Sequence, residues 1–113
     1  MSFLSRLLGG PNSLSPADFV SQRDASAPVL DVRTPAEFAQ GHLADAVNVD
    51  VMAPNFHERV AAMNLPAASP VYLYCRSGNR SGTATTILQQ MGHAGAVNAG
   101  GFAALVGAGA ATA

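Results

Sequence analysis

Short apolar runs alternate with helical segments along most of the chain. Four runs are short, rich in apolar residues and bounded by turn residues, as buried strands are: residues 28–32, 46–49, 71–74 and 96–98. Five other segments carry helical spacing or helix-start signals: residues 16–23, the stretch between 34 and 41, and residues 56–63, 81–91 and 101–106. Because strands and helices alternate, we expect crossover units that build a parallel sheet covered by helices on both faces.

Two of the predicted helices begin with the same signal. Ser15 and Thr34 are each followed by a proline and, three residues on, by an acid. This is the pattern of an N-cap residue, a proline at the first helical position and an acid at the third. Gly41 is expected to end the second of these helices after barely two turns.

The two ends of the chain differ from its centre. Residues 1–12 are interpreted as a tail, because their apolar stretch is interrupted by Arg6 and lacks the cleavage site of a secretory signal. Residues 107–113 contain only alanine, glycine and threonine, which predicts a flexible tail. A single domain over residues 13–106 is expected between them, with no internal repeat.

Charge and cysteine content narrow the classes of function. Charged residues make up 12% of the chain and the net charge is −1, which argues against binding to nucleic acid or electrostatic binding to a membrane. All six basic residues are arginine, so Schiff-base chemistry on lysine is excluded. A single cysteine excludes an internal disulfide, and no run approaches the roughly 20 residues of a membrane span. We therefore expect a cytoplasmic protein that is a monomer or a weak dimer.

The most informative segment is Cys75-Arg76-Ser77-Gly78-Asn79-Arg80-Ser81. It follows the apolar run 71–74 directly, so the only cysteine ends a predicted buried strand and opens a polar loop that leads into a helix. Such a loop turns backbone N–H groups inward, and the helix adds the positive end of its dipole. These groups and the two arginines favour the thiolate, which is the nucleophilic form of cysteine. The alternative is a buried, inert structural cysteine, but the neighbouring Gly, Asn and Ser residues favour an anion-binding loop.

With these segments in place, the chain resembles a single-domain rhodanese, a sulfurtransferase of the rhodanese homology family. The matching motifs occur in the order of the family over about residues 13–105. They are Leu30-Asp31-Val32-Arg33, Glu37-Phe38, Gly41-His42-Leu43, Ala46-Val47-Asn48-Val49, the cysteine loop with its strand, and Gly100-Gly101-Phe102. One departure is Leu105, where the family often has an aromatic residue. The resemblance implies a three-layer α/β fold, in which a mostly parallel sheet of about five short strands carries helices on both faces.

The resemblance also implies a reaction. Cys75 would take a sulfane sulfur from a small anionic donor such as thiosulfate and pass the persulfide sulfur to a thiol, cyanide or a protein acceptor. Loop residues 76–81 would bind the substrate, with Arg76 as the main contact for the donor, whereas Arg80 would either bind it too or pair with Asp31 or Glu37. Related phosphatases carry a Cys-x5-Arg loop; the shorter Cys-x4-Arg loop here resembles that of the sulfur-transferring members.

Other polar residues have alternative interpretations. Asp31 and Arg33 could tune the pocket, but a structural ion pair or capping network, for instance between Arg33 and Glu37, is the favoured reading. His42 is expected to bond to backbone carbonyls in a structural turn. Ser81 could donate to the sulfur or cap the following helix. No His, Cys and Asp spacing matches a metal site, and persulfide chemistry requires neither a metal nor another cofactor. A non-catalytic rhodanese-like module that binds proteins or carries sulfur is the alternative function.

Overall fold

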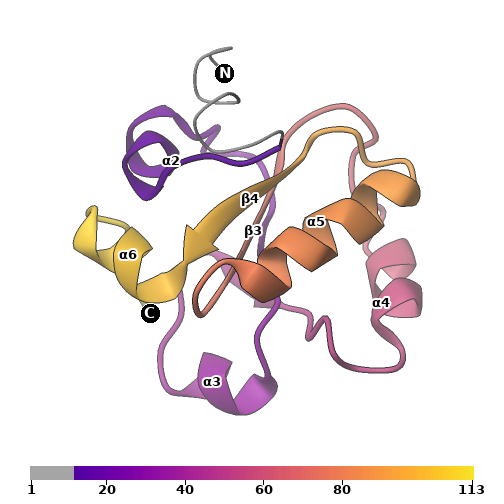
Figure 1. Cartoon of the computed structure of the whole chain (residues 1–113), viewed down its shortest axis with the longest axis horizontal. Helices are drawn as coiled ribbons and strands as arrows, with labels where there is room; N and C mark the ends of the chain where they lie inside the picture. The colour runs from indigo at the N-terminus through magenta and orange to yellow at the C-terminus, as the bar shows by residue number, and fades with distance from the viewer. Residues whose placement is uncertain (1–11) are drawn as a thin grey trace.

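The computed structural model describes residues 12–113, which fold into one α/β domain (Figure 1). The elements run in the order α2 (Pro16–Gln22), β1 (Val29–Asp31), α3 (Pro35–Ala39), β2 (Ala46–Asn48), α4 (Phe56–Ala62), β3 (Val71–Cys75), α5 (Asn79–Gln90), β4 (Ala96–Gly101) and α6 (Phe102–Gly107). Strand and helix types agree with those that the hydrophobic pattern predicts. The expected tail falls almost wholly in residues 1–11, which lie outside the described residues.

The sheet is parallel, as predicted, and its strand order is β2-β1-β3-β4. Within residues 12–113 it has four strands, which are the four apolar runs of the sequence, whereas the resemblance implied about five. The segment before α2 lies along β4, where Leu14 N–H donates to the Asn98 carbonyl and Asn98 N–H to the Asn12 carbonyl. This pairing ends after a single bridge at Ser13, because Ser15 already caps the first helix and the chain turns away.

Helices cover both faces of the sheet because alternate residues of β3 point to opposite sides. Val71, Leu73 and Cys75 pack in one hydrophobic cluster, which Phe56 and Val60 of α4 and Ala84 and Leu88 of α5 complete. Tyr72 and Tyr74 pack in the other, with Phe19 of α2 and Leu105 of α6. All five residues of β3 are buried. The central strand therefore carries the cysteine into the α5 side of the core.

The predicted helix starts are confirmed. The Ser15 hydroxyl accepts a hydrogen bond from Asp18 N–H at 3.1 Å. At α3, the Thr34 hydroxyl accepts from Glu37 N–H and the Glu37 carboxylate accepts from Thr34 N–H, a complete capping box. These caps begin helices of only seven and five residues. The start of α3 is therefore set by the hydrogen bonds of its capping box.

Two boundaries differ from those that the pattern predicts. Helix α5 begins at Asn79 rather than near Ser81, because Gly78 adopts a left-handed conformation (φ +97°) at the N-cap position and turns the chain into the helix early.

Residues 107–113, predicted as a flexible tail, are hydrogen-bonded to the segment after α3: Ala44 N–H donates to the Ala111 carbonyl and Ala113 N–H to the His42 carbonyl. Ala111 and Ala113 supply these backbone groups although the segment has low sequence complexity.

Within the described part of the chain, none of the helices has the length and apolar character that crossing a membrane would require.

Candidate functional site

The cysteine loop lies where the parallel strands end, which is where open α/β sheets bind ligands. Cys75 is the last residue of β3 and its side chain is almost fully buried, at 1% exposure. The chain then makes a tight loop and enters α5 at Asn79. Gly101 of β4 packs against this loop so closely that a Cβ atom there would lie 2.6 Å from the Arg76 carbonyl oxygen. A glycine at this position is therefore required by the close approach of the two backbones.

Two hydrogen bonds reach the sulfur atom. Gly78 N–H donates to Cys75 Sγ at 3.0 Å, and the Ser81 hydroxyl lies 3.3 Å from it. Burial raises the pKa of the Cys75 thiol, but the hydrogen bonds of the Ser81 hydroxyl and of the backbone N–H groups of Ser81, Ser77 and Gly78 lower it more, so the net pKa lies below its ordinary value. The site therefore stabilises a thiolate by N–H and O–H donors.

Ser81 is not the N-cap of α5, which the sequence left open; that position belongs to Gly78. Its buried hydroxyl lies between Sγ and the side chain of Asn98, whose Oδ1 is 2.7 Å away. A hydroxyl has one proton, so Ser81 donates to one of these two acceptors at a time. Negative charge on the sulfur favours donation to Sγ.

Asn98 of β4 is a site residue that the sequence analysis missed. Its Nδ2 donates to the Gly78 carbonyl at 3.1 Å, and its Oδ1 accepts from Ser81 and from Gly100 N–H. One side chain thus positions both the loop and the hydroxyl that faces the sulfur. The sequence did hold a signal for Asn98, since it is a polar residue inside a short apolar strand close to the Gly100-Gly101 pair. Nothing in the strand indicates, however, that Asn98 bonds to a loop residue 20 positions away.

Arg80 pairs with Glu37, one of the two partners considered from the sequence. Its Nη1 and Nη2 donate to Oε1 and Oε2 at 2.7 and 2.9 Å. These hydrogen bonds from Arg80 are the main reason that the pKa of Glu37 falls to about 2. Arg80 is therefore committed to linking the active loop to α3, and both oxygens of Glu37 are occupied.

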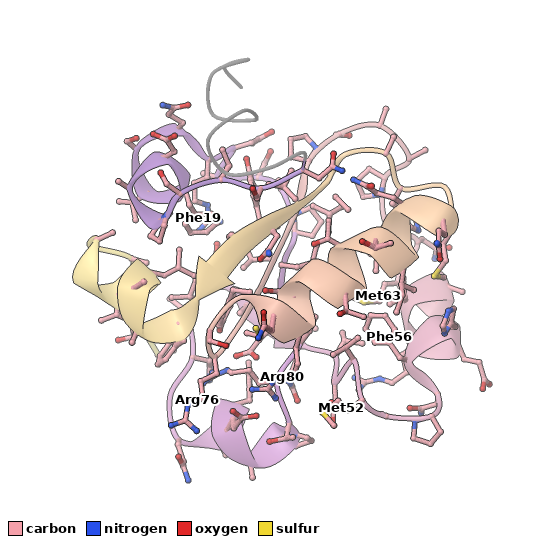
Figure 2. All side chains as sticks on the ribbon, viewed as in Figure 1. Phe19, Met52, Phe56, Met63, Arg76 and Arg80 are labelled. Carbon is pink, nitrogen blue, oxygen red and sulfur yellow. The ribbon has the colours of Figure 1, made fainter. Side chains whose placement is uncertain are left out.

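Three residues of the loop are exposed, namely Arg76, Ser77 and Asn79. Figure 2 shows the labelled Arg76 and Arg80 at the end of the sheet where α3 lies. Arg76 forms no ion pair with the residues that the structure describes, and it borders a cavity of about 340 Å³ together with Arg33 and Phe102. Of the two loop arginines, Arg76 is thus the one whose guanidinium is available to an anion that enters the site.

Asp31 and Arg33 form the structural ion pair that was favoured, although Arg33 pairs with Asp31 itself rather than with Glu37. Arg33 Nη2 lies 2.6 Å from Asp31 Oδ2, and the Tyr74 hydroxyl donates to the same oxygen at 2.7 Å. Burial and this hydrogen bond to Asp31 raise the pKa of Tyr74 well above its usual range, so the phenol stays a donor. The Tyr74 oxygen accepts from Leu43 N–H, and Arg33 Nη2 donates to the Gly41 carbonyl. This buried network joins β1, β3 and the segment that follows α3.

His42 also has a structural environment. Its Nδ1 lies 3.0 Å from the Phe38 carbonyl oxygen, and its ring stacks on that of Phe38 with 3.7 Å between centroids. Among residues 12–113, no group of three or more His, Cys, Asp or Glu side chains is placed to hold a metal ion. The donors around Cys75 are N–H and O–H groups, which suit an anionic sulfur species.

Comparison with known proteins places this geometry in a family. The family model of the rhodanese-like domain matches residues 15–108, which include the cysteine loop, the Asp31–Arg33 pair and the Gly100-Gly101 end of β4. The chain belongs to the rhodanese-like domain family. This assignment confirms the resemblance found in the sequence.

Curated relatives of this rhodanese-like domain include two thiosulfate sulfurtransferases. The chain is 36% identical over 73 residues to thiosulfate sulfurtransferase PspE of Escherichia coli, covering 65% of this chain and 68% of the relative. It is 39% identical over 85 residues to the chloroplastic thiosulfate sulfurtransferase 16 of Arabidopsis thaliana, with 66% and 70% of the two chains covered.

Solved structures agree with the fold. A rhodanese-related protein of Thermoplasma volcanium superimposes with a TM-score of 0.74 at 25% identity, over 90% of this chain and 97% of that one. A rhodanese from E. coli with bound anions gives a TM-score of 0.67 at 30% identity, over 78% and 98% of the two chains.

The acidity of the thiol can be tested in this rhodanese-like domain by its rate of alkylation against pH. We expect the midpoint for Cys75 to lie below about 8.5, the ordinary value for cysteine, because loop N–H groups and the Ser81 hydroxyl stabilise the thiolate. Ser81→Ala removes one of these donors and should raise the midpoint. Ser77→Ala, which removes an exposed hydroxyl with no contact to Sγ, serves as the control. A wild-type midpoint at or above the ordinary value would contradict the description of the loop as a thiolate site.

Proposed function

We propose that this protein is a rhodanese-type sulfurtransferase that moves a sulfane sulfur from a donor such as thiosulfate to a thiophilic acceptor through a persulfide on Cys75. The observation that carries the proposal is the buried Sγ with Gly78 N–H at 3.0 Å and the Ser81 hydroxyl at 3.3 Å. These donors stabilise the negative charge of the Cys75 thiolate, the nucleophile of the proposed reaction. The names of the relatives from E. coli and A. thaliana support the same class of reaction.

The proposed chemistry consists of two displacements at sulfur. The Cys75 thiolate attacks the outer sulfur of thiosulfate, a new S–S bond forms, and the old S–S bond breaks so that sulfite leaves with the electron pair. The persulfide keeps the single negative charge that the thiolate carried. A nucleophile such as cyanide then attacks the terminal sulfur, and Cys75 leaves as a thiolate. Both steps balance without an external oxidant or reductant, and neither needs a metal.

The mass of the intact protein tests the proposal. Incubation with thiosulfate should add one sulfur atom, and subsequent cyanide should remove it. A protein that stays unmodified with thiosulfate and with other sulfane-sulfur donors would favour a non-catalytic interaction module instead.

Arg76 is proposed to bind the anionic end of the donor. Its guanidinium is exposed at the loop, borders the cavity and has no ion pair among residues 12–113. Loss of one charge-assisted contact costs about 1.5–3 kcal/mol, so Arg76→Ala should lower kcat/KM for thiosulfate by about tenfold to a hundredfold, mainly through KM. Its free energy of unfolding should stay near that of the wild type, since no structural contact is lost.

Two other arginines provide comparisons for Arg76→Ala. Unlike Arg76→Ala, Arg80→Ala should lower the free energy of unfolding, because Arg80 links the loop to Glu37 of α3. Arg59→Ala removes the same charge from the exposed surface of α4, together with a hydrogen bond to the Asn48 carbonyl, and should leave kcat/KM within about twofold. If Arg76→Ala keeps the KM of the wild type, the donor is bound by backbone N–H groups rather than by this guanidinium.

A further inference from the structure

Asn98 lies beside the active loop but on a different strand, and each of its polar atoms is bonded. Its backbone N–H donates to the Asn12 carbonyl, and its carbonyl accepts from Leu14 N–H. Its Cα partner on β3 is Leu73, which packs in the same cluster as Cys75. Because neighbouring residues of paired strands point to the same face of a sheet, the Asn98 side chain lies on the α5 side, where the sulfur is.

An irregularity in β4 fixes the orientation of this side chain. The pairing of β3 with β4 shifts register directly after Asn98, and bulges of this kind redirect side chains next to active sites. Asn98 Oδ1 accepts from Gly100 N–H at 3.0 Å, and Nδ2 donates to the Gly78 carbonyl at 3.1 Å. The amide is therefore held from both ends, and its Oδ1 faces the hydroxyl of Ser81.

The Ser81 hydroxyl is the one donor here with two competing acceptors. Its oxygen lies 2.7 Å from Asn98 Oδ1 and 3.3 Å from Cys75 Sγ, and Ser81 is fully buried. The shorter contact holds the single proton while the sulfur is neutral. A charged sulfur attracts it, because hydrogen bonds to an ionised acceptor are stronger. Rotation about the bond from carbon to the hydroxyl oxygen is sufficient for this exchange, so no heavy atom has to move.

The charge on Sγ alternates during the proposed reaction. The Cys75 thiolate bears the charge on Sγ until it attacks the outer sulfur of the donor and sulfite leaves with the electron pair of the old bond. In the persulfide, Sγ is bonded to a second sulfur, and the charge lies on that terminal atom. When the acceptor attacks the terminal sulfur, the S–S bond breaks and its electron pair returns to Sγ. The Ser81 proton stays covalently bound to its oxygen throughout, and only its acceptor changes.

We propose that Asn98 is a positioning residue for this sulfur transfer, which holds the Ser81 proton while Sγ is neutral and releases it to Sγ when the charge returns. The inference rests on the proposed function. Asn98 thereby stabilises the thiol and the persulfide relative to the thiolate, in which its bond with Ser81 is absent. Its side-chain bonds to Gly78 and Gly100 do not use that proton, so they cancel from the comparison of the three states.

The alkylation midpoint of Cys75 tests the exchange without a sulfur donor. Asn98→Leu removes the acceptor that competes with the sulfur, so the midpoint should fall by about 0.5–1 pH unit, the equivalent of one neutral hydrogen bond. In a Ser81→Ala background the same substitution should not lower the midpoint, because there is no hydroxyl proton to release. Damage to the loop alone would raise the midpoint in both backgrounds.

The charges around the sulfur are the same in all these variants. The charged side chains on the neighbouring strand ends and the loop are the ion pairs Arg80–Glu37 and Arg33–Asp31 together with Arg76. The charged residues of α4 lie on its exposed surface. Because every one of them is retained, the difference between the two backgrounds reports the contact of Ser81 with Asn98.

The two half-reactions give a second readout. Asn98→Leu should slow the loading of Cys75 by thiosulfate and speed the discharge of the persulfide by cyanide, because a less basic thiolate is a weaker nucleophile and a better leaving group. At a pH above both midpoints, the ratio of discharge rate to loading rate should rise by about twofold to tenfold. Asn48→Leu removes an asparagine that bonds instead to the backbone carbonyls of Asp31 and Arg33, and it should keep the wild-type ratio.

A measurement on the wild type keeps the test independent of how the variants fold. In the ¹⁵N-labelled protein, the side-chain amide signal of Asn98 should shift as Cys75 ionises. It should return towards its thiol position in the persulfide, although the thiolate and the persulfide carry the same charge. If the shift with ionisation occurs in a protein that no donor loads, the exchange of the Ser81 proton stands and sulfur transfer is wrong. An Asn98 signal that stays constant, equal midpoint shifts in both backgrounds, or equal slowing of both half-reactions would overturn the role of Asn98.

Discussion

Cys75→Ser is expected to lower thiosulfate-dependent sulfur transfer to the rate measured without protein. Cys75 carries the only thiol in the chain, and its sulfur accepts hydrogen bonds from Gly78 N–H and the Ser81 hydroxyl. A serine hydroxyl is a much weaker nucleophile at neutral pH and cannot take up a sulfane sulfur as a persulfide. Formation of thiocyanate from thiosulfate and cyanide measures the activity, and intact mass shows whether the added sulfur is absent.

Two measurements make this result specific. Serine is nearly isosteric with cysteine, so the unfolding curve of Cys75→Ser should remain close to that of the wild type. Ser77→Ala removes an exposed hydroxyl that forms no hydrogen bond with Sγ and leaves the backbone N–H in place, so this variant should keep most of the activity. A Cys75→Ser variant that still turns over thiosulfate would show that the reaction does not pass through the thiol and would refute the proposed mechanism.

Asp31→Ala is expected to destabilise the fold by about 3–5 kcal/mol, the usual cost of removing one partner from a buried ion pair. Asp31 is fully buried, and Arg33 is nearly so. Without the carboxylate, the Arg33 guanidinium and the Tyr74 hydroxyl would both lose their main partner inside the core. Because a domain of this size has a total stability of only about 5–15 kcal/mol, the midpoint of urea denaturation should fall by a large fraction of its wild-type value.

Asp45→Ala is the matched control for Asp31→Ala. It breaks another Asp–Arg pair, with Arg23, but the Asp45 side chain is 51% exposed. Exposed pairs contribute about 0–1 kcal/mol, so this variant should unfold near the wild-type midpoint. Tyr74→Phe removes one hydroxyl from the buried network and should fall between the two, at about 1–3 kcal/mol. If Asp31→Ala costs no more than Asp45→Ala, the buried network does not hold β1, β3 and the segment after α3 together.

The elements of the fold were largely predictable because their signals are local. The apolar run of β3 and the caps at Ser15 and Thr34 each depend on neighbours within a few residues. The four apolar runs became the four strands of the sheet. The pairing of the segment before α2 with β4 was not predictable, because it depends on residues 85 positions apart, Ser13 and Asn98. The hydrogen bonds of the C-terminal residues had no sequence signal either, since alanine and glycine contribute through their backbone.

The sequence by itself determined the order of strands and helices, the placement of Cys75 at the end of a buried strand and the loop that follows it. These depend on side-chain periodicity and on the backbone preferences of glycine, proline and the capping residues. Only the tertiary structure decided that Arg80 pairs with Glu37 while Arg76 stays available. It also decided that Arg33 pairs with Asp31. In the same way, it placed Asn98 where its side chain positions Ser81 and Gly78. The reason is that hydrogen bonds and ion pairs between distant segments depend on which strands become neighbours and on which face of the sheet each side chain lies. Neither property can be read from a residue and its immediate neighbours.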